Sequence, residues 1–232
     1  MPEPSAANLG RPLRADARRN RERILGAARD LFVEEGPDAP LEAVAARAGV
    51  GIATLYRRFP DRSALMRAVV GDVLERVAEE ARLALAEEPD PFAALARYLH
   101  RALDLRVSAV VPALIGRISL VDEEIAPLRE MSAQRMEMLI ARAQAAGALR
   151  PDVSFGDIGP LLVRLARPLP GPLPRDLDDR LAHRHLDLVL DGLRADERPN
   201  HPLPEPRLTL AELRAMAPPA AGADAPAPPG NA

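Results

Sequence analysis

LEAVAARAGVGIATLYRRFPDRSAL, residues 41–65, is the stretch of the chain that decides the fold. Its apolar spacing predicts one short helix over residues 41–48 and a second over residues 51–58, joined through Gly49. Glycine can take the left-handed backbone conformation that such a turn requires. Asp61 can cap the next helix, because its carboxylate can accept the free N–H groups of a first helical turn. These features have the length and turn of a helix-turn-helix.

The two faces of the second short helix differ in chemistry. Apolar side chains can close a small core beneath the first helix, whose helical spacing begins at Ile24: Val44, Ala45, Ala48, Val50, Leu55 and Phe59. The outward face offers small residues, hydroxyls and two arginines, which suit the floor of a DNA groove and phosphate oxygens: Gly51, Ile52, Ala53, Thr54, Tyr56, Arg57 and Arg58. On shape alone, a generic helical corner with a solvated basic end remains an alternative to DNA binding.

The amino-acid sequence of this region resembles the N-terminal domain of the TetR family of transcriptional regulators. The resemblance covers RERILGAARDLFVEEG at 21–36, the stretch at 41–65, and a basic segment before them. Its most specific positions are Gly49, Val50, Thr54, Leu55, Tyr56, Phe59, Asp61, Arg62 and Leu65. One departure is Pro40-Leu41, where the family usually has a serine or threonine, so a hydroxyl contact to phosphate is not expected there.

The resemblance implies roles for individual residues. Ile52, Ala53 and Thr54 would meet base edges in the major groove. Tyr56, Arg57 and Arg58 would hold the DNA backbone, and Arg62 would reach a phosphate at the start of the next helix. Ile52 and Ala53 offer mostly apolar contact, so these side chains provide little direct readout of the base sequence. Arg47, the basic arm or DNA shape is therefore expected to add specificity.

At the level of the whole chain, the resemblance implies a homodimer on a palindromic double-stranded operator. It further implies a repressor released by a small apolar effector, with no cofactor and no enzymatic activity.

Helical periodicity continues to about residue 193, and no segment alternates with the period of a strand. We therefore expect an all-α protein of about nine helices. The expected domains are a flexible basic arm at 1–15, a helix-turn-helix domain at 16–60, a ligand-binding and dimerisation domain at 61–196, and a disordered Pro/Ala-rich tail at 197–232. The dimer is expected through helices at 158–167 and 175–193, whose apolar stripes exceed the needs of one chain's core.

Composition narrows the classes of function. The 232 residues carry a net charge of −3, but residues 1–67 hold 12 arginines against 9 acidic residues. A basic beginning on an acidic body suggests contact with a polyanion. The chain has no cysteine and 3% aromatic residues, which exclude thiolate chemistry and disfavour stacking on single-stranded nucleic acid. No secretory signal or membrane span is recognisable, so we expect a cytoplasmic protein without membrane contact.

An apolar effector pocket is expected among the helices from residue 92 to residue 165. Its polar candidates are Tyr98, His100, Arg101, Arg117 and Gln134, although a His100 that is hydrogen-bonded within the protein or half-exposed is the better interpretation of that residue. The acidic run at 122–124 is read as a solvated helix start, so no metal site is expected.

Two functions of other classes stay open from the sequence. They are a small all-α enzyme, for which no catalytic set is recognisable, and a helical interaction module that does not bind DNA. Binding to duplex DNA that weakens steeply with salt distinguishes the regulator from both.

Overall fold

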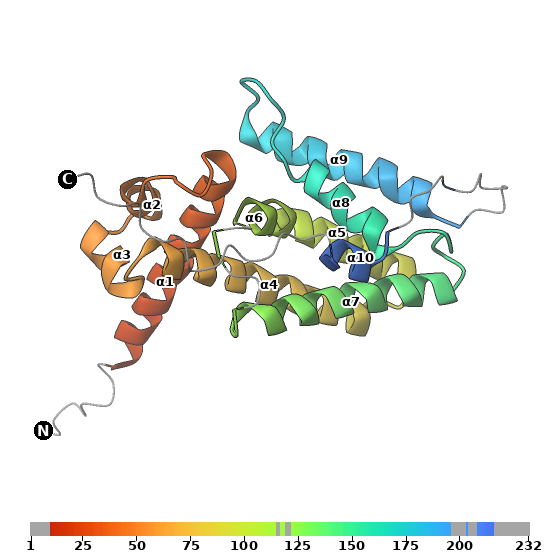
Figure 1. The fold of residues 1–232 in the computed structure, drawn as a ribbon, viewed down its shortest axis with the longest axis horizontal. Coiled ribbons are helices and arrows are strands. Elements are labelled where there is room, and N and C mark those ends of the chain that lie inside the picture. The colour runs from red at the N-terminus through yellow and green to blue at the C-terminus, as the bar shows by residue number, and fades with distance from the viewer. Residues whose placement is uncertain (1–9, 115–116, 119–121, 196–202, 204–207, 216–232) are drawn as a thin grey trace, which may run out of the picture.

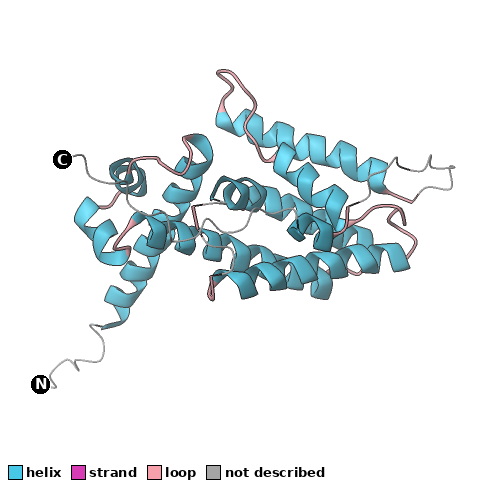
Figure 2. Cartoon of the chain, in the orientation of Figure 1, coloured by secondary structure: helices cyan, strands magenta, loops and turns pink. Residues whose placement is uncertain are grey.

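The computed structural model describes residues 10–114, 117–118, 122–195, 203 and 208–215. These residues form ten α-helices and no β-strand, as Figures 1 and 2 show, so the prediction of an all-α fold is confirmed. The helices are α1 (Gly10–Glu34), α2 (Leu41–Ala48), α3 (Ile52–Arg58), α4 (Arg62–Glu87), α5 (Pro91–Asp104), α6 (Val107–Leu114), α7 (Ile125–Ala145), α8 (Phe155–Leu165), α9 (Arg175–Leu193) and α10 (Leu210–Ala215).

Helices α1 to α3 form the unit at one end of the molecule (Figure 1), and local signals in the sequence set their boundaries. Gly49 ends α2 with φ of 64°, the left-handed conformation expected of it. Asp61 caps α4, and its side chain accepts the N–H of Ala64 at 2.7 Å. Leu55 and Phe59 are buried beneath α1, as predicted.

The first hydrophobic core is not confined to these three helices. It continues into the first half of α4 and takes in Val110 and Leu114 of α6 and Ile125 of α7. The start of the long helix α4 is therefore part of the same packed unit as the helix-turn-helix. A displacement of α6 or α4 acts directly on the helices that precede them, because close-packed interiors transmit strain.

The second core lies between α4, α5, α7, α8 and α9, and includes Phe92, Leu99, Leu139 and Leu186. Helix α4 packs against both α5 and α7. Helix α8 begins with a capping box, in which the side chain of Ser154 accepts the backbone N–H of Asp157 and the side chain of Asp157 accepts the backbone N–H of Ser154. Helices α4, α5, α7 and α8 of this bundle supply part of the wall of the cavity described below.

The structure differs from the sequence expectation at the junction of α5 and α6. The apolar stripe from Phe92 to Val107 predicts one continuous helix, but the chain turns at Leu105 and Arg106. Arg106 has φ of 53°, which is uncommon for a residue other than glycine. The residue is 9% exposed, and its side chain donates to Asp179 of α9 at 2.9 Å, a tertiary contact that local periodicity cannot reveal.

Both ends of the chain also differ from expectation in the described residues. Helix α1 begins at Gly10, so residues 10–15 of the expected flexible arm are helical. Pro12 is compatible with this start, because the N–H that proline lacks has no intrahelical partner in a first turn. In the expected disordered tail, residues 210–215 form α10, which packs against α8. Residues 1–9 and most of the remaining tail lie outside the described residues.

Candidate nucleic-acid interface and ligand cavity

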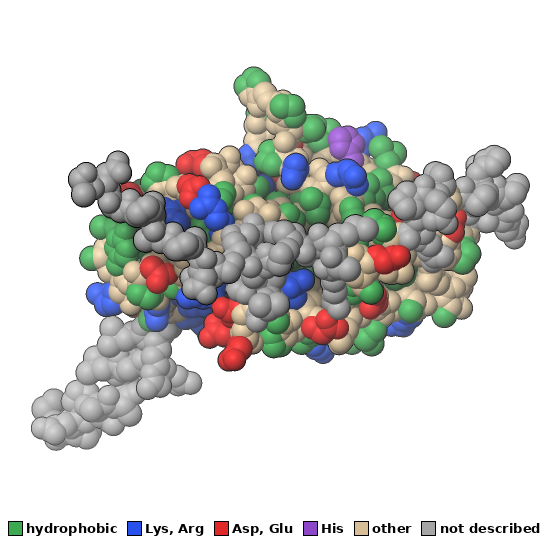
Figure 3. All heavy atoms as spheres, viewed as in Figure 1, with side chains coloured by type: hydrophobic (Ala, Val, Ile, Leu, Met, Phe, Trp, Pro, Cys, Tyr) green, Lys and Arg blue, Asp and Glu red, His purple; other side chains and the backbone are tan. Residues whose placement is uncertain are grey.

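The outward face of α3 is exposed to solvent. Ile52 is 36% exposed and Tyr56 is 45% exposed, while Leu55 between them is fully buried. Gly51, Ala53 and Arg57 are also exposed, and Thr54 is half-buried. Figure 3 shows hydrophobic side chains at this end of the molecule with basic side chains beside them. The face is a convex helix that carries apolar, hydroxyl and cationic groups.

The turn before α3 fixes the direction of this helix. Gly49 and Val50 donate their backbone N–H groups to Ala46 and Ala45, closing the end of α2. Gly51 then caps α3 in an extended conformation. With Leu55 held in the core, the opposite side of α3 must face outward, since side chains on one face of a helix recur every three to four residues.

Three arginines that were predicted to contact DNA, namely Arg47, Arg58 and Arg62, also form bonds within the protein. Arg47 forms an ion pair with Glu34 of α1 at 2.6 Å, and this hydrogen bond raises the pKa of the guanidinium. Arg58 donates to the carbonyl of Ala17 at 2.9 Å. These contacts tie α2 and α3 to α1, so both side chains orient the helix-turn-helix whatever else they bind.

Arg62 differs most from its expected surroundings. Its Nη1 donates to the carbonyls of Pro37 and Ala39, at 2.9 and 2.6 Å, and the side chain is partly buried. The residue therefore anchors the loop between α1 and α2. A phosphate contact by its remaining donors stays a prediction.

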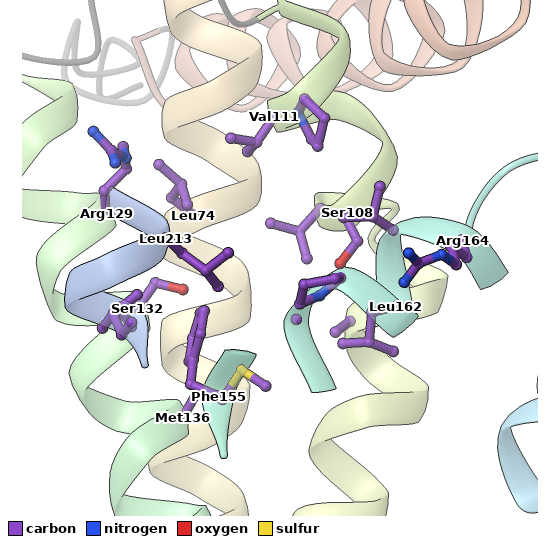
Figure 4. A pocket seen from close by; sticks show the side chains of 18 of the residues that line it. Leu74, Ser108, Val111, Arg129, Ser132, Met136, Phe155, Leu162, Arg164 and Leu213 are labelled. Carbon is purple, nitrogen blue, oxygen red and sulfur yellow. The ribbon is translucent and has the colours of Figure 1, made fainter. Parts of the chain in front are cut away.

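A cavity of about 650 Å3 lies between α4, α5, α6, α7, α8 and α10. Figure 4 shows Ser108 and Ser132 with their hydroxyls directed inward, among Leu74, Met136, Phe155 and Leu162. Its volume is in the range of protein sites for small organic molecules, and its walls are mostly apolar. The bundle therefore offers a site for a small molecule with a large apolar part.

Of the five predicted effector contacts, only Tyr98 lines this cavity. It is buried, and burial raises the pKa of its phenol to about 12, while a hydrogen bond with Ser132 acts in the opposite direction. The phenol is therefore neutral at physiological pH.

The structure does not bring the other four side chains to the cavity. Arg101 bonds to Glu80 and Asp104, Arg117 to Asp38, and Gln134 to Glu130, all on exposed surfaces. His100 lies between α5 and α9. The apolar stripe of a helix predicts which face is buried, but not which part of that face borders a cavity.

His100 pairs with His183 of α9, eighty-three positions further along the chain. Their Nδ1 atoms are 2.8 Å apart and the ring planes differ by 12°. Each Nε2 lies 3.0 Å from a carboxylate oxygen, of Asp187 for His100 and of Asp104 for His183. The four side chains form one hydrogen-bonded chain that joins α5 to α9, so His100 is a satisfied structural residue.

Apart from Tyr98, sequence reasoning missed the cavity's polar groups, and it missed one of its walls. The residues not foreseen are Ser108, Arg129, Ser132, Arg164, Arg167, Leu210 and Leu213. The last two belong to α10. A signal for this helix was present: Thr209 and Glu212 have capping-box spacing, and in the structure the two residues bond to each other.

A close backbone contact holds α10 at the cavity. Ser154 Oγ donates to the carbonyl of Leu208 at 2.9 Å. A Cβ added to Gly156 would lie 1.6 Å from the same oxygen, so only glycine allows this approach. Leu213 then extends into the cavity, as Figure 4 shows.

Within the ranges that the structure describes, no group of three or more His, Asp or Glu side chains is placed to hold a metal ion. In the same ranges, no helix is long and apolar enough to cross a membrane.

A helix-turn-helix with an exposed second helix, joined to a bundle that encloses a cavity, defines a two-part helical protein of the helix-turn-helix class. Residues 24–69 match the bacterial regulatory proteins of the tetR family, and residues 90–195 match the C-terminal domain of SbtR-like transcriptional regulators. The chain belongs to the TetR family of transcriptional regulators.

Solved structures resemble the chain over most of its length. A TetR transcriptional regulator from Streptomyces coelicolor is 34% identical, with 75% of this chain and 98% of that chain covered and a TM-score of 0.54. One from Mycobacterium vanbaalenii is 35% identical, with coverage of 79% and 99% and a TM-score of 0.56. LfrR from Mycobacterium smegmatis, whose structure holds proflavine, is 25% identical, with coverage of 73% and 95% and a TM-score of 0.55.

The match to curated relatives is shorter. An HTH-type transcriptional regulator of Staphylococcus aureus is 42% identical over 59 residues, which are 25% of this chain and 32% of the relative. The chain thus spans about a third of the length of the curated relatives that it matches.

Proposed function

We propose that this protein is a homodimeric repressor that binds a palindromic operator through α3 and leaves it when a small molecule enters the bundle cavity. The observation that carries the proposal is the exposed face of α3, with Ile52 36% and Tyr56 45% exposed on a helix whose Leu55 is fully buried. Apolar side chains that stay exposed one turn apart on the same helix face, beside hydroxyl and cationic groups, are typical of a binding surface.

Each group on this face suits one part of duplex DNA. Ile52 and Ala53 can make apolar contact in the major groove, for instance with a thymine methyl, and Thr54 can hydrogen-bond a base edge. Tyr56 and Arg57 suit phosphate oxygens, which fix the position of a recognition helix without reading sequence. Arg47, Arg58 and Arg62 contribute to orientation through their bonds to the α1 region.

The outer surface of α9 supports the homodimer. Leu188 is 61% exposed, and Leu169 and Leu173 in the loop before α9 are 46% and 36% exposed. A two-fold contact through α8 and α9 would cover these apolar side chains. Such a dimer presents two copies of α3 to successive half-sites, which is why the operator is expected to be palindromic.

The cavity supports the response to an effector. It borders α6, and α6 packs against both α1 and α4, so a molecule that moves α6 acts on the helix-turn-helix. LfrR, a family member with the same fold, holds the small molecule proflavine in its solved structure. A repressor that acts on bacterial DNA works in the cytoplasm.

A direct test begins with selection of duplex fragments of the source genome that the purified protein binds. Binding of the selected operator is then measured by fluorescence anisotropy at several salt concentrations. We expect a specific complex of one dimer per site whose affinity falls steeply as salt rises. Failure to enrich any sequence, or affinity that does not respond to salt, would contradict DNA binding through this face.

A further inference from the structure

The charged residues that line the cavity are all of one sign. Arg129, Arg164 and Arg167 are among its lining residues, and within the part of the chain that the structure describes no aspartate or glutamate is. This lining contrasts with the chain as a whole, which has 34 acidic against 31 basic residues.

Two of these arginines are grouped near the end of α8. Arg164 is in the last turn of α8, and Arg167 follows one turn later; both are exposed. Among the described residues, neither has an ion-pair or hydrogen-bond partner. By contrast, Arg97 bonds to Glu87 and Glu88. The cation pair at the cavity is left for a ligand or for solvent.

The wall between these arginines is neutral. Figure 4 shows Arg129 and Arg164 on opposite sides, with the apolar side chains of Leu74, Met136 and Leu162 between them. Tyr98 adds a neutral phenol, whose pKa burial raises further, to about 12. An apolar body is favoured along these walls by burial, at about 25 cal/mol per Å2 of apolar surface.

We infer that the ligand of this cavity is an apolar molecule with one anionic group, seated with that group at Arg164 and Arg167. A cationic ligand would meet like charge at this end, whereas an anion forms charge-assisted hydrogen bonds with guanidinium groups. The inference rests on the proposed function in one respect: it takes this cavity to be the effector site.

The matched probes are 1-anilinonaphthalene-8-sulfonate and N-phenyl-1-naphthylamine, which share one ring skeleton and differ by the sulfonate. Proflavine serves as the cationic probe. Binding of each to the full chain is followed by fluorescence. We expect the sulfonate to bind at least about tenfold more tightly than the neutral probe, which corresponds to ~1.4 kcal/mol, and proflavine to bind most weakly.

Variants test whether Arg164 and Arg167 cause the preference for the sulfonate probe. In the double variant Arg164→Gln/Arg167→Gln, the advantage of the sulfonate over the neutral probe should disappear. Arg82→Gln is the matched control, because Arg82 is exposed on α4 and pairs only with nearby Glu79, and the advantage should persist there. Ala133→Phe, which places bulk on the cavity wall, should weaken both naphthalene probes together.

Three results would overturn the inference: equal affinity for the two naphthalene probes, tighter binding of proflavine, or an unchanged advantage in the double variant. Absence of cavity binding by every probe would also overturn it. Operator binding is measured separately. A chain that binds no duplex DNA but keeps the anion preference would contradict the proposed function and leave the ligand class standing.

Discussion

Arg175, the first residue of α9, donates to Glu34 near the end of α1 at 2.8 Å, across 141 positions of sequence. The same guanidinium lies 2.9 Å from Asp30 of α1. Glu34 also pairs with Arg47 of α2. The start of α9 is thereby joined through two carboxylates to the helices that present α3.

Replacing Arg175 tests whether this ion-pair cluster orients the helix-turn-helix. In Arg175→Gln we expect only a small loss of stability, because partly exposed ion pairs contribute about 0–1 kcal/mol. Operator affinity should nevertheless fall about threefold or more, since two copies of α3 must match a fixed half-site spacing. The control is Arg180→Gln, whose partner Asp176 is on the same helix. Equal affinities of the two variants in anisotropy titrations would show that the cluster has no orienting role.

The contact between Gly156 and Leu208 gives a second prediction. Gly156→Ala should separate α10 from α8, because the new Cβ would lie 1.6 Å from the Leu208 carbonyl oxygen. We expect faster proteolysis within residues 208–215 and weaker binding of the naphthalene probes, with the rest of the fold retained. Gly26→Ala serves as control, since a Cβ there meets nothing closer than 4.0 Å. The same digestion pattern in both variants would mean that α10 does not depend on this approach.

Tyr98 gives a prediction about alkaline pH. The folded state raises the pKa of Tyr98 from 10.0 to about 12, chiefly by burial. The neutral phenol is thus favoured in the folded state, so its contribution to stability is fully present below pH 10 and is lost as pH rises toward 12. The chain has two tyrosines and no tryptophan, so the variant Tyr56→Phe reports on Tyr98 alone.

In that variant, the ultraviolet absorbance of tyrosinate should rise only near pH 12, or together with unfolding. Circular dichroism recorded on the same samples separates the two cases. Half-ionisation at pH 10 with the helical signal intact would contradict the burial of this phenol.

The cap of α4 is expected to stabilise the junction between the two parts of the molecule. Asp61→Ala removes the acceptor for the Ala64 N–H and should lower the free energy of unfolding by about 0.5–2 kcal/mol. Asp61→Asn keeps an acceptor oxygen and should lose much less. Thermal melts of the three proteins make the comparison, and equal losses in both variants would assign the effect to charge instead of capping.

Features that depend on neighbouring residues could be predicted from the sequence. Gly49 adopts the left-handed turn, Asp61 caps α4, and Leu55 is buried, because each of these outcomes follows from residues within one or two helical turns. The same local reasoning gave the exposed face of α3. Together these features define the helix-turn-helix.

Features that depend on distant contacts could not be predicted in this way. His100 and His183 pair across 83 positions, and Arg106 breaks a helical stripe while bonding to Asp179 of α9. Helix α10 owes its position to Gly156, more than 50 residues earlier in the chain. Four of five predicted cavity residues failed to reach the cavity for the same reason: periodicity gives the inward face of one helix, not the space left between several.

The central claim is that the exposed face of α3 binds the operator, and titration of that operator with variants of this face tests it most directly. Arg57 is the preferred charge substitution, because it is exposed, whereas Arg62 also anchors the loop before α2. The matched control is Arg82→Gln on α4. Leu55→Ala shows what damage to the core does, and we expect it to lower the free energy of unfolding by about 2–5 kcal/mol, as measured by thermal melts.

We predict that Tyr56→Phe and Arg57→Gln each weaken operator binding without lowering the melting temperature. Arg57→Gln should act about equally on all DNA sequences and reduce the slope of affinity against salt by about one. Thr54→Ala should instead lose discrimination of about 1–3 kcal/mol at one operator position. Operator affinity and salt slope that stay at the unmodified protein's values in both Tyr56→Phe and Arg57→Gln would contradict the placement of α3 in the groove.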